Sequence, residues 1–300
     1  MSRRIAFILS ATAGGRSDGE AFLPFRERID QIANGGPVTV VRTGGDIREA
    51  VRGALAQACD AVVAAGGDGT LNAVASCLVG TPVVFGVMPF GTLNHFARDA
   101  GIPLDANEAL DVIERGRVDT VDVGQIAGRH FLNNASLGLY VQVVRHRELQ
   151  QSRLGRGKWP AFAWALWSAL RRFPFMTFRI DVDGVESEIR TPFLFLGNNR
   201  YEINGLKIGR RQSLQGGTLS IYHAERAGRR RLFVFALHAL LGRLGSRHDF
   251  HETTAKRLHI SSRHRSLRLA TDGEVVQVET PLDCRILARA LKVYVPGNRS

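Results

Sequence analysis

The chain has 300 residues, of which 44% are hydrophobic and 23% are charged, a composition typical of one large globular domain or two smaller ones. Its formal net charge of +12 favours anionic partners, whether nucleic acid, lipid surfaces or phosphorylated ligands, but a solvated basic surface is an equally simple explanation. Its three widely spaced cysteines exclude a disulfide framework and a cysteine zinc site, and no apolar run reaches the ~18 residues of a membrane-spanning helix. We therefore expect a cytoplasmic protein in a reducing compartment.

Alternating strands and helices are predicted in the first third of the chain. Short apolar runs indicate four strands, at residues 5–9, 38–41, 61–65 and 83–87. Apolar residues recur at helical intervals between 47 and 58, and a second helix at 105–114 has Asp105 as its candidate N-cap. Strands that alternate with helices need crossover connections, so this part predicts a parallel sheet with helices on both faces.

The pattern changes after about residue 117, where strand-like runs follow one another through short turns. Residues 178–189 and 267–278 each alternate apolar and polar side chains around a central Asp-Gly pair, which accepts the positive φ angles of a type I′ hairpin turn. This part therefore predicts antiparallel β structure. We expect an N-terminal domain of residues 1–125 and a C-terminal domain of residues 126–285, with residues 286–300 as a candidate addition to the first domain.

A glycine-rich loop follows the third predicted strand. Residues 66–70 are Gly-Gly-Asp-Gly-Thr, and they lead into a predicted helix. Glycines let the backbone turn tightly and approach a ligand, and the N-terminus of a helix favours a phosphate. The spacing matches neither the P-loop nor the dinucleotide-binding Gly-x-Gly-x-x-Gly motif. For this loop alone, an ordinary strand-to-helix turn with Asp68 as the cap is the alternative.

A second loop of similar kind follows the fourth predicted strand, where residues 89–94 are Pro-Phe-Gly-Thr-Leu-Asn. The carboxyl ends of neighbouring parallel strands meet at one edge of a sheet, and open α/β sheets bind their ligands at that edge. We therefore expect the two loops to converge on a single ligand site.

The two loops resemble those of the diacylglycerol kinase catalytic-domain family, in particular of its soluble bacterial lipid-kinase branch. Residues 272–274, Asp-Gly-Glu, are a third match, and residues 131–138 and 196–199 are weaker ones. Together the matches extend over nearly the whole chain in the order of the family. The first loop is shared with NAD kinases, whereas the second loop distinguishes the lipid kinases from them.

The resemblance implies an N-terminal α/β nucleotide-binding domain with a parallel sheet, a C-terminal antiparallel β-sandwich, and an active site in the cleft between the two domains. It implies an enzyme that transfers the γ-phosphate of ATP to a hydroxyl group of diacylglycerol or a related lipid, with Mg²⁺ as the metal cofactor. The residues that it assigns to the nucleotide are Thr43, Gly66, Gly67, Asp68, Gly69, Thr70, Leu71, Asn72, Gly91, Thr92 and Asn94.

Catalytic roles for two acidic residues also follow from the resemblance. Asp68 is expected to organise the Mg²⁺, and Glu274 is expected to be the general base that accepts the proton of the lipid hydroxyl. Phosphoryl transfer needs charge neutralisation, positioning and a base near the attacking hydroxyl, which agrees with these roles. Asp122 is a further candidate Mg²⁺ ligand. Taken without the family, Glu274 is better explained as a solvated strand residue after a turn.

Two departures from the family pattern affect the expected metal sites. Many members have an aspartate where this chain has His95, and the change removes a carboxylate from the Mg²⁺ site. The structural metal loop of the family has an aspartate-rich core, whereas residues 213–218 are Ser-Leu-Gln-Gly-Gly-Thr and contain no carboxylate. Because Mg²⁺ prefers oxygen ligands that include a carboxylate, we expect this second metal site to be absent or weak.

Aromatic residues gather in the segment 158–173, which contains all three tryptophans between basic ends. Such a helix is typical of a membrane interface, and its spacing is equally consistent with a helix packed on the sandwich. Residues 229–243 also have basic ends and an apolar middle. We expect a lipid substrate and peripheral contact with anionic membrane. We expect no nucleic acid, because no recognition motif accompanies the basic charge. A homodimer is left open.

Two other functions are compatible with the sequence. An NAD kinase-like enzyme that acts on a soluble nucleotide explains the first loop but not the second. A nucleotide-binding regulatory protein without catalysis is consistent with His95 and with the lost metal loop. The sequence does not choose the acceptor among diacylglycerol, a sphingoid base and other hydroxylated lipids.

Overall fold

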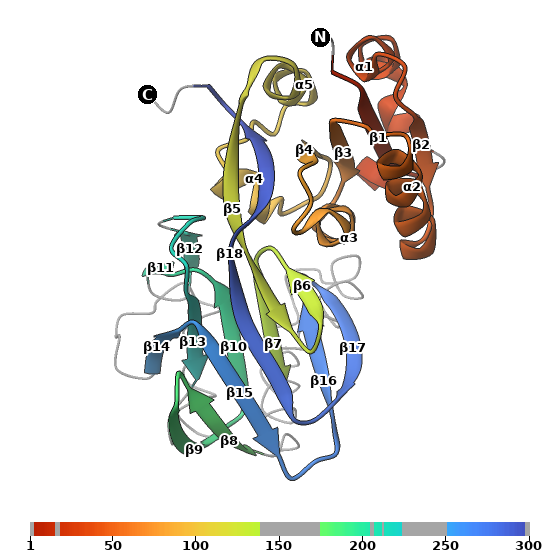
Figure 1. The fold of residues 1–300 in the computed structure, drawn as a ribbon. Coiled ribbons are helices and arrows are strands. Elements are labelled where there is room, and N and C mark those ends of the chain that lie inside the picture. The colour runs from red at the N-terminus through yellow and green to blue at the C-terminus, as the bar shows by residue number, and fades with distance from the viewer. Residues whose placement is uncertain are drawn as a thin grey trace, which may run out of the picture.

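The computed structural model describes residues 3–15, 19–138, 175–204, 207–211, 213–223 and 251–297. These residues form an N-terminal α/β part and a C-terminal part of antiparallel strands, which lie one above the other in Figure 1. Both predicted architectures are confirmed. The tryptophan-rich segment 158–173 and the basic segment 229–243 lie outside the described residues.

A parallel sheet forms the centre of the N-terminal part, with the strand order β2-β1-β3-β4. Its strands are β1 (Ile5–Ser10), β2 (Val38–Val41), β3 (Ala61–Gly66) and β4 (Val84–Pro89). β3 is buried along its whole length, as expected for a strand that is covered on both faces. The four apolar runs of the sequence are thus confirmed as strands.

Helices cover both faces of this sheet (Figure 1). α2 (Gly44–Ala56) and α3 (Asp68–Leu78) pack on one face, and α1 (Arg26–Ala33) and α5 (Ala106–Arg115) pack on the other. Each pair of helices encloses its own apolar core against the sheet. The shorter helices of this part are η1 (Ala13–Gly15), η2 (Glu20–Phe25) and α4 (His95–Asp99).

Side-chain caps begin two of these helices. Asp105 accepts hydrogen bonds from the backbone N–H groups of Asn107 and Glu108, at 2.9 and 3.1 Å, which confirms it as the N-cap of α5. Thr43 caps α2 in a capping box, because its Oγ1 accepts from the N–H of Asp46 while the Asp46 carboxylate accepts from the N–H of Thr43. Such caps stabilise a helix by satisfying amides of its first turn.

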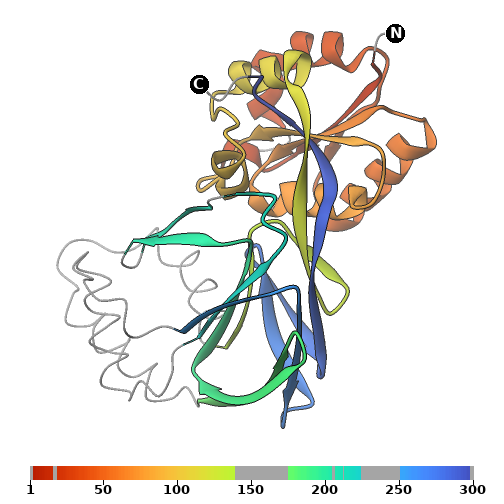
Figure 2. The same cartoon turned by 60° about the vertical axis from the view of Figure 1, so that its left-hand side comes forward.

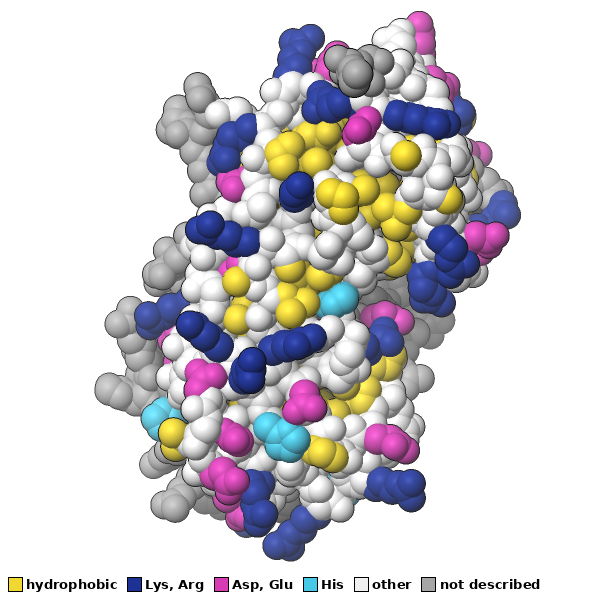
Figure 3. All heavy atoms as spheres, viewed as in Figure 1, with side chains coloured by type: hydrophobic (Ala, Val, Ile, Leu, Met, Phe, Trp, Pro, Cys, Tyr) yellow, Lys and Arg dark blue, Asp and Glu magenta, His cyan; other side chains and the backbone are white. Residues whose placement is uncertain are grey.

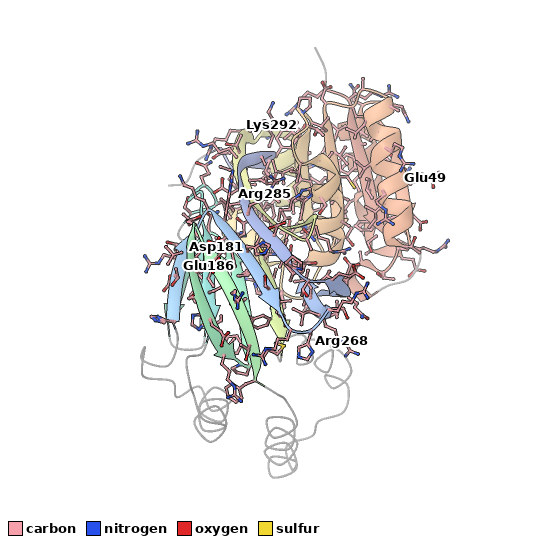
Figure 4. The ribbon with its side chains drawn as sticks, turned by 60° about the horizontal axis from the view of Figure 1, so that its bottom comes forward. Glu49, Asp181, Glu186, Arg268, Arg285 and Lys292 are labelled. Carbon is pink, nitrogen blue, oxygen red and sulfur yellow. The ribbon has the colours of Figure 1, made fainter. Side chains whose placement is uncertain are left out.

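Two long strands run through both parts of the molecule, as Figure 2 shows. They are β5 (Arg117–Ile126) and β18 (Leu282–Val295), which pair with each other antiparallel. β18 pairs with β4 at Lys292, and it pairs with β15 (Arg257–Ser262) at Arg285. Figure 4 labels both residues along this strand. One continuous sheet therefore extends from the N-terminal part into the C-terminal part.

The C-terminal part has two layers of antiparallel strands. The strands not yet named are β6 (Arg129–Phe131), β7 (Asn134–Gly138), β8 (Met176–Val182), β9 (Val185–Thr191), β10 (Phe193–Asn198), β11 (Tyr201–Asn204), β12 (Lys207–Arg211), β13 (Leu219–His223), β14 (His251–Ala255), β16 (Ser266–Thr271) and β17 (Glu274–Glu279). One layer continues the first sheet through β18-β15-β8-β9, and the other is the sheet β14-β13-β10-β7-β16-β17. Apolar side chains of both layers meet in a common core, among them Phe178, Leu196 and Leu269.

Both predicted Asp-Gly hairpins are present. Asp183 and Gly184 join β8 to β9, and Asp272 and Gly273 join β16 to β17. The φ angles are 49° and 94° in the first turn and 46° and 90° in the second. Positive φ at both positions is the geometry of a type I′ turn, which matches the twist of the strands that it joins.

Candidate active site

The glycine-rich loop and the second loop lie side by side at the carboxyl edge of the parallel sheet. The backbone N–H of Phe90 donates to the carbonyl of Gly66 at 2.9 Å. A Cβ atom on Gly91 would lie 2.8 Å from the Cα of Gly67 and 2.7 Å from the Oδ1 of Asn94. Only glycine therefore allows the two loops to approach so closely. The expected convergence of the loops is confirmed.

Two glycines of the first loop have different surroundings. A Cβ atom on Gly66 would lie 2.9 Å from the Cβ of Thr70, so this glycine lets the strand pack against the start of α3. A Cβ atom on Gly69 would meet no atom within 4 Å. The backbone N–H groups in the first turn of a helix have no partner inside the helix, and Gly69 belongs to that turn of α3. The first turn of α3 thus has room for a phosphate group.

Asp68 and Asn72 lie four residues apart on α3, so their side chains share one face of the helix. The Oδ1 atom of each is buried and accepts no hydrogen bond from the described residues. A buried oxygen without a donor lowers stability by about 1–3 kcal/mol, which a bound cation or ligand would recover. A carboxylate and an amide oxygen are ligands that suit Mg²⁺, so these residues fit the expected metal.

The other predicted nucleotide contacts differ in what their side chains can offer. Thr43 is exposed, but its hydroxyl already caps α2. Leu71 is fully buried in the core below α3, which leaves only its backbone for a ligand. Thr92 is exposed within the second loop. The amide of Asn94 bonds the N–H and the carbonyl of Gly91, at 2.8 and 2.7 Å, and therefore shapes the second loop.

Glu274 is the first residue of β17, directly after the Asp-Gly turn. Its side chain is 64% exposed, and its Oε2 lies 2.9 Å from the Nη2 of Arg129. The carboxylate is therefore open to solvent on one side and held by a guanidinium on the other.

Asp272 anchors the turn that carries Glu274. Its carboxylate accepts backbone N–H bonds from Leu132, Asn133 and Asn134, at 2.6, 2.9 and 3.0 Å. The residue is partly exposed at the turn, but these amides enclose the carboxylate itself. Removal from water raises the pKa of Asp272 to about 6, although the three amides oppose that rise. The turn is thereby fixed to the chain that precedes β7.

β6 connects this turn to α3. The Nδ1 of His130 lies 3.2 Å from the carbonyl oxygen of Ser76 on α3, and the Nδ2 of Asn72 donates to the carbonyl of His130 at 3.4 Å. Burial lowers the pKa of His130, which keeps the imidazole neutral near pH 7. The neighbouring Arg129 forms the ion pair with Glu274. The helix of the glycine loop and the Glu274 turn therefore both contact β6, although they come from distant parts of the sequence.

Asp122 lies elsewhere. It is 1% exposed within β5, its Oδ2 accepts from the N–H of Gly217, and its Oδ1 accepts from the N–H of Arg289, both at 2.7 Å. Both oxygens are thus used by backbone amides, and this geometry gives no support to Asp122 as a Mg²⁺ ligand. Its role in the structure is to tie the loop before β13 to the bulge of β18.

An amide side chain occupies the loop that corresponds to the structural metal site of the family. The Nε2 of Gln215 donates to the Oδ1 of Asp119 and to the carbonyl of Thr120, both at 2.7 Å. Within the described ranges, no group of three or more His, Cys, Asp and Glu side chains is arranged to hold a metal ion. The described part of the chain also contains no helix long and apolar enough to cross a membrane.

Three residues of the site region were not singled out by the sequence. Arg129 and His130 lie directly before the weak family match at 131–138, which was the one available clue to them. Arg211 is buried and donates to the carbonyl of Leu132 and to the side chain of Asn133, but no motif surrounds it. His95, the departure from the family pattern, is exposed at the start of α4.

Solved structures share the whole fold. A diacylglycerol kinase of Bacillus anthracis is 20% identical, with a TM-score of 0.69 over 98% of this chain and 97% of that chain. The yeast NADH kinase in complex with NADH is 13% identical, with a TM-score of 0.56 over 99% and 84%. At these identities the likeness concerns the fold alone, and it defines the class of fold: an α/β domain joined to a β-sandwich.

Sequence comparison defines the family. The diacylglycerol kinase catalytic domain matches residues 4–126, and the YegS C-terminal NAD kinase beta sandwich-like domain matches residues 135–295. The chain therefore belongs to the diacylglycerol kinase catalytic-domain family, and it is a kinase.

Curated relatives agree with this assignment. A protein of Pseudomonas syringae named probable lipid kinase YegS-like is 32% identical over 85% of this chain and 82% of its own length. A diacylglycerol kinase of Mycobacterium tuberculosis is 27% identical over 90% and 89%. A Yersinia enterocolitica protein named probable lipid kinase YegS-like is 37% identical, but over only 44% of this chain and 45% of its own length.

Proposed function

We propose that the chain is an ATP-dependent lipid kinase, which transfers the γ-phosphate of ATP to a lipid hydroxyl. The observation that carries this proposal is the pair of buried oxygens on Asp68 and Asn72, on the helix whose first turn contains the unobstructed Gly69. Phosphate groups and a cation bound there would satisfy these oxygens and the amides in the first turn of α3. Family membership supports a nucleotide as the phosphate donor.

Asp68 and Asn72 would hold Mg²⁺, which neutralises phosphate charge when it is bound. The two loops would bind and position the phosphate groups. Residues 66–72 would place helix amides against the phosphates, and the close contact at Gly91 holds the second loop beside residues 66–67. Because phosphoryl transfer depends mainly on positioning and on charge stabilisation, a rigid pair of loops is what the reaction needs.

Glu274 would accept the proton of the attacking hydroxyl at its carboxylate. It is exposed enough to meet a substrate that arrives from outside the molecule, and Arg129 restrains its orientation at 2.9 Å. The turn beneath it is held by the three amide bonds to Asp272. The fixed turn and the ion pair with Arg129 would keep this base within hydrogen-bonding distance of the substrate hydroxyl.

A lipid acceptor is favoured over a soluble one by the relatives named lipid kinase and diacylglycerol kinase. A lipid acceptor lies in a bilayer, so the enzyme would work at a membrane surface, and the net charge of +12 favours an anionic one. The NADH kinase with the same fold makes a soluble nucleotide the second candidate acceptor.

The test is transfer of radiolabelled γ-phosphate from ATP to a panel of acceptors. The panel contains diacylglycerol, monoacylglycerol and a sphingoid base in mixed vesicles, with NAD as the soluble acceptor, and mass spectrometry identifies the product. We expect a phosphorylated lipid and no phosphorylated NAD. Label in NAD alone would favour the NAD kinase-like alternative. ATP binding without transfer to any acceptor would favour a regulatory protein.

A further inference from the structure

Arg211, at the end of β12, is a buried cation outside the candidate catalytic residues. Its side chain is 0% exposed and that of its partner Asp99 is 7% exposed, and their Nε and Oδ2 atoms lie 2.7 Å apart. Charged side chains are almost never buried this completely unless they are paired. The pair therefore requires an explanation beyond ordinary surface charge.

The guanidinium of Arg211 bonds several further oxygens. Nη1 donates to the carbonyl of Leu132 and, at 3.4 Å, to the carbonyl of Asn198, while Nη2 donates to the Oδ1 of Asn133 at 3.1 Å. The ring of Tyr201 lies 5.8 Å from the guanidinium carbon. These partners come from three separate stretches of the chain, which one side chain joins to β12.

Two of these segments belong to the candidate active site. Asp99 is the last residue of α4, the helix that follows the second nucleotide loop. Within this helix, the N–H of Arg98 donates to the carbonyl of Asn94, the last residue of that loop. On the other side, Leu132 and Asn133 are residues whose amides hold the carboxylate of Asp272. Arg211 thus links the end of α4, the helix after the second loop, to the segment that anchors the Asp272 turn.

The energetics favour a role in geometry over one in stability. Removing an ion pair from water is costly, and well-packed apolar residues of similar volume often give an equally stable protein. An apolar cluster does not fix the relative orientation of the segments that it joins, because its contacts have no preferred direction. The planar fork of arginine holds its oxygen partners at set angles, and a lysine of the same charge does not reproduce this.

We infer that Arg211 is a positioning residue, which sets the placement of the Glu274 turn relative to the second nucleotide loop by bridging Asp99 to Asn133. This inference rests on the proposed function for its catalytic consequence. Its structural consequence, the protection of the amides that bond Asp272, does not depend on that function, because it can be measured without turnover.

The test uses Arg211→Lys and Asp99→Asn in the full chain, with Arg200→Lys as the matched control. Arg200 forms an exposed ion pair with Glu252 at 2.8 Å, on the strand connection near Arg211. Hydrogen exchange is measured for the amides of 132–134, with those of 61–65 in β3 as the internal reference. ATP affinity is measured by equilibrium binding, and turnover is measured with an accepted lipid.

We expect about tenfold faster exchange at 132–134 in both test variants, with β3 unchanged. Turnover should fall about 10- to 100-fold, because small misplacements of catalytic groups have effects of this size, while ATP affinity and the control stay near wild type. Unchanged exchange at 132–134 would overturn the inference, and so would failure of both variants to fold. An inactive wild-type protein would refute the proposed function and leave the exchange result to decide the inference.

Discussion

At the scale of single residues, Asp272 shows how a motif residue acts through the backbone. Glu274 is the residue of the Asp-Gly-Glu motif to which the family resemblance assigns catalysis. Asp272 is the residue of that motif that accepts three backbone N–H hydrogen bonds and fixes the turn. Its surroundings raise the pKa of the carboxyl to about 6, above the ordinary value for aspartate. The effect of desolvation on this pKa is therefore larger than the opposing effect of the three amides, and the ionised carboxylate lowers the stability of the folded state.

This balance predicts a pH dependence of stability. Because the pKa in the folded state lies above that in the unfolded state, the contribution of Asp272 is fully present below about pH 4 and is lost as the pH rises through about 6. Relative to Asp272→Asn, the wild type should lose about 1–3 kcal/mol of unfolding free energy over that interval. Urea denaturation of both proteins across the interval measures it. A difference that does not vary with pH would contradict the assigned pKa.

Asp68 permits a second test at this scale. Asp68→Asn keeps the shape of the side chain and removes the charge from the candidate metal site, so Mg²⁺ should bind more weakly. We expect the Mg²⁺ concentration for half-maximal turnover to rise at least about tenfold, together with a fall in turnover at saturation. Asp30→Asn, at an exposed aspartate that pairs with Arg26, is the control. An unchanged response to Mg²⁺ would remove Asp68 from the metal site.

At the scale of elements, the first turn of α3 decides whether the glycine loop binds a nucleotide. Gly69 and Gly53 are both helical, and a Cβ atom on either one meets nothing within 4 Å, so the fold itself accepts a side chain at both. Gly69→Val should weaken ATP binding at least about tenfold, because the new side chain fills the space beside the helix N-terminus. Gly53→Val should leave it unchanged. Equal affinities, measured by calorimetry, would show that no ligand approaches Gly69.

Elements with a local signal could be predicted from the sequence. Each parallel strand is a short apolar run, and burial on both faces is what makes the run continuous in β3. The hairpins at Asp183 and Asp272 were predictable because type I′ turns need positive φ at both positions, which Asp-Gly accepts. The convergence of the two loops followed from the parallel order of their strands.

Features made by distant segments had no such signal. Arg211 takes its partners from residues 99, 132, 133 and 198, and nothing near it in the sequence marks it as buried. Asp122 was a candidate Mg²⁺ ligand in the sequence, and the amides that its oxygens accept from belong to Gly217 and Arg289, which follow it by 95 and 167 residues. Partners of this kind are set by the tertiary fold alone.

At the scale of the whole molecule, β5 and β18 make the two parts mechanically continuous (Figure 2). The charge is distributed over both parts. On the face shown in Figure 3, Lys and Arg side chains are spread from end to end and alternate with Asp and Glu. A net charge of +12 that is spread in this way favours a non-specific electrostatic attraction to an anionic surface.

Membrane contact is testable through its two expected components. We predict that the protein sediments with anionic vesicles, that salt weakens this binding by screening, and that Trp164→Ala/Trp167→Ala weakens it further by removing interfacial aromatic rings. Neutral vesicles are the control for charge. Binding that is insensitive to salt would contradict the electrostatic component, and wild-type binding by the double variant would exclude the segment 158–173 as the anchor.

In the proposed enzyme, the glycine loop of one part and the Asp-Gly-Glu turn of the other form a single phosphoryl-transfer site. The most direct test is turnover and ATP affinity of Glu274→Gln, with Glu279→Gln at the exposed far end of β17 as the control. We expect ATP to bind Glu274→Gln as it binds the wild type, while phosphate transfer to the accepted lipid falls roughly 10²- to 10⁴-fold, the usual contribution of a general base. Wild-type turnover by Glu274→Gln would contradict it.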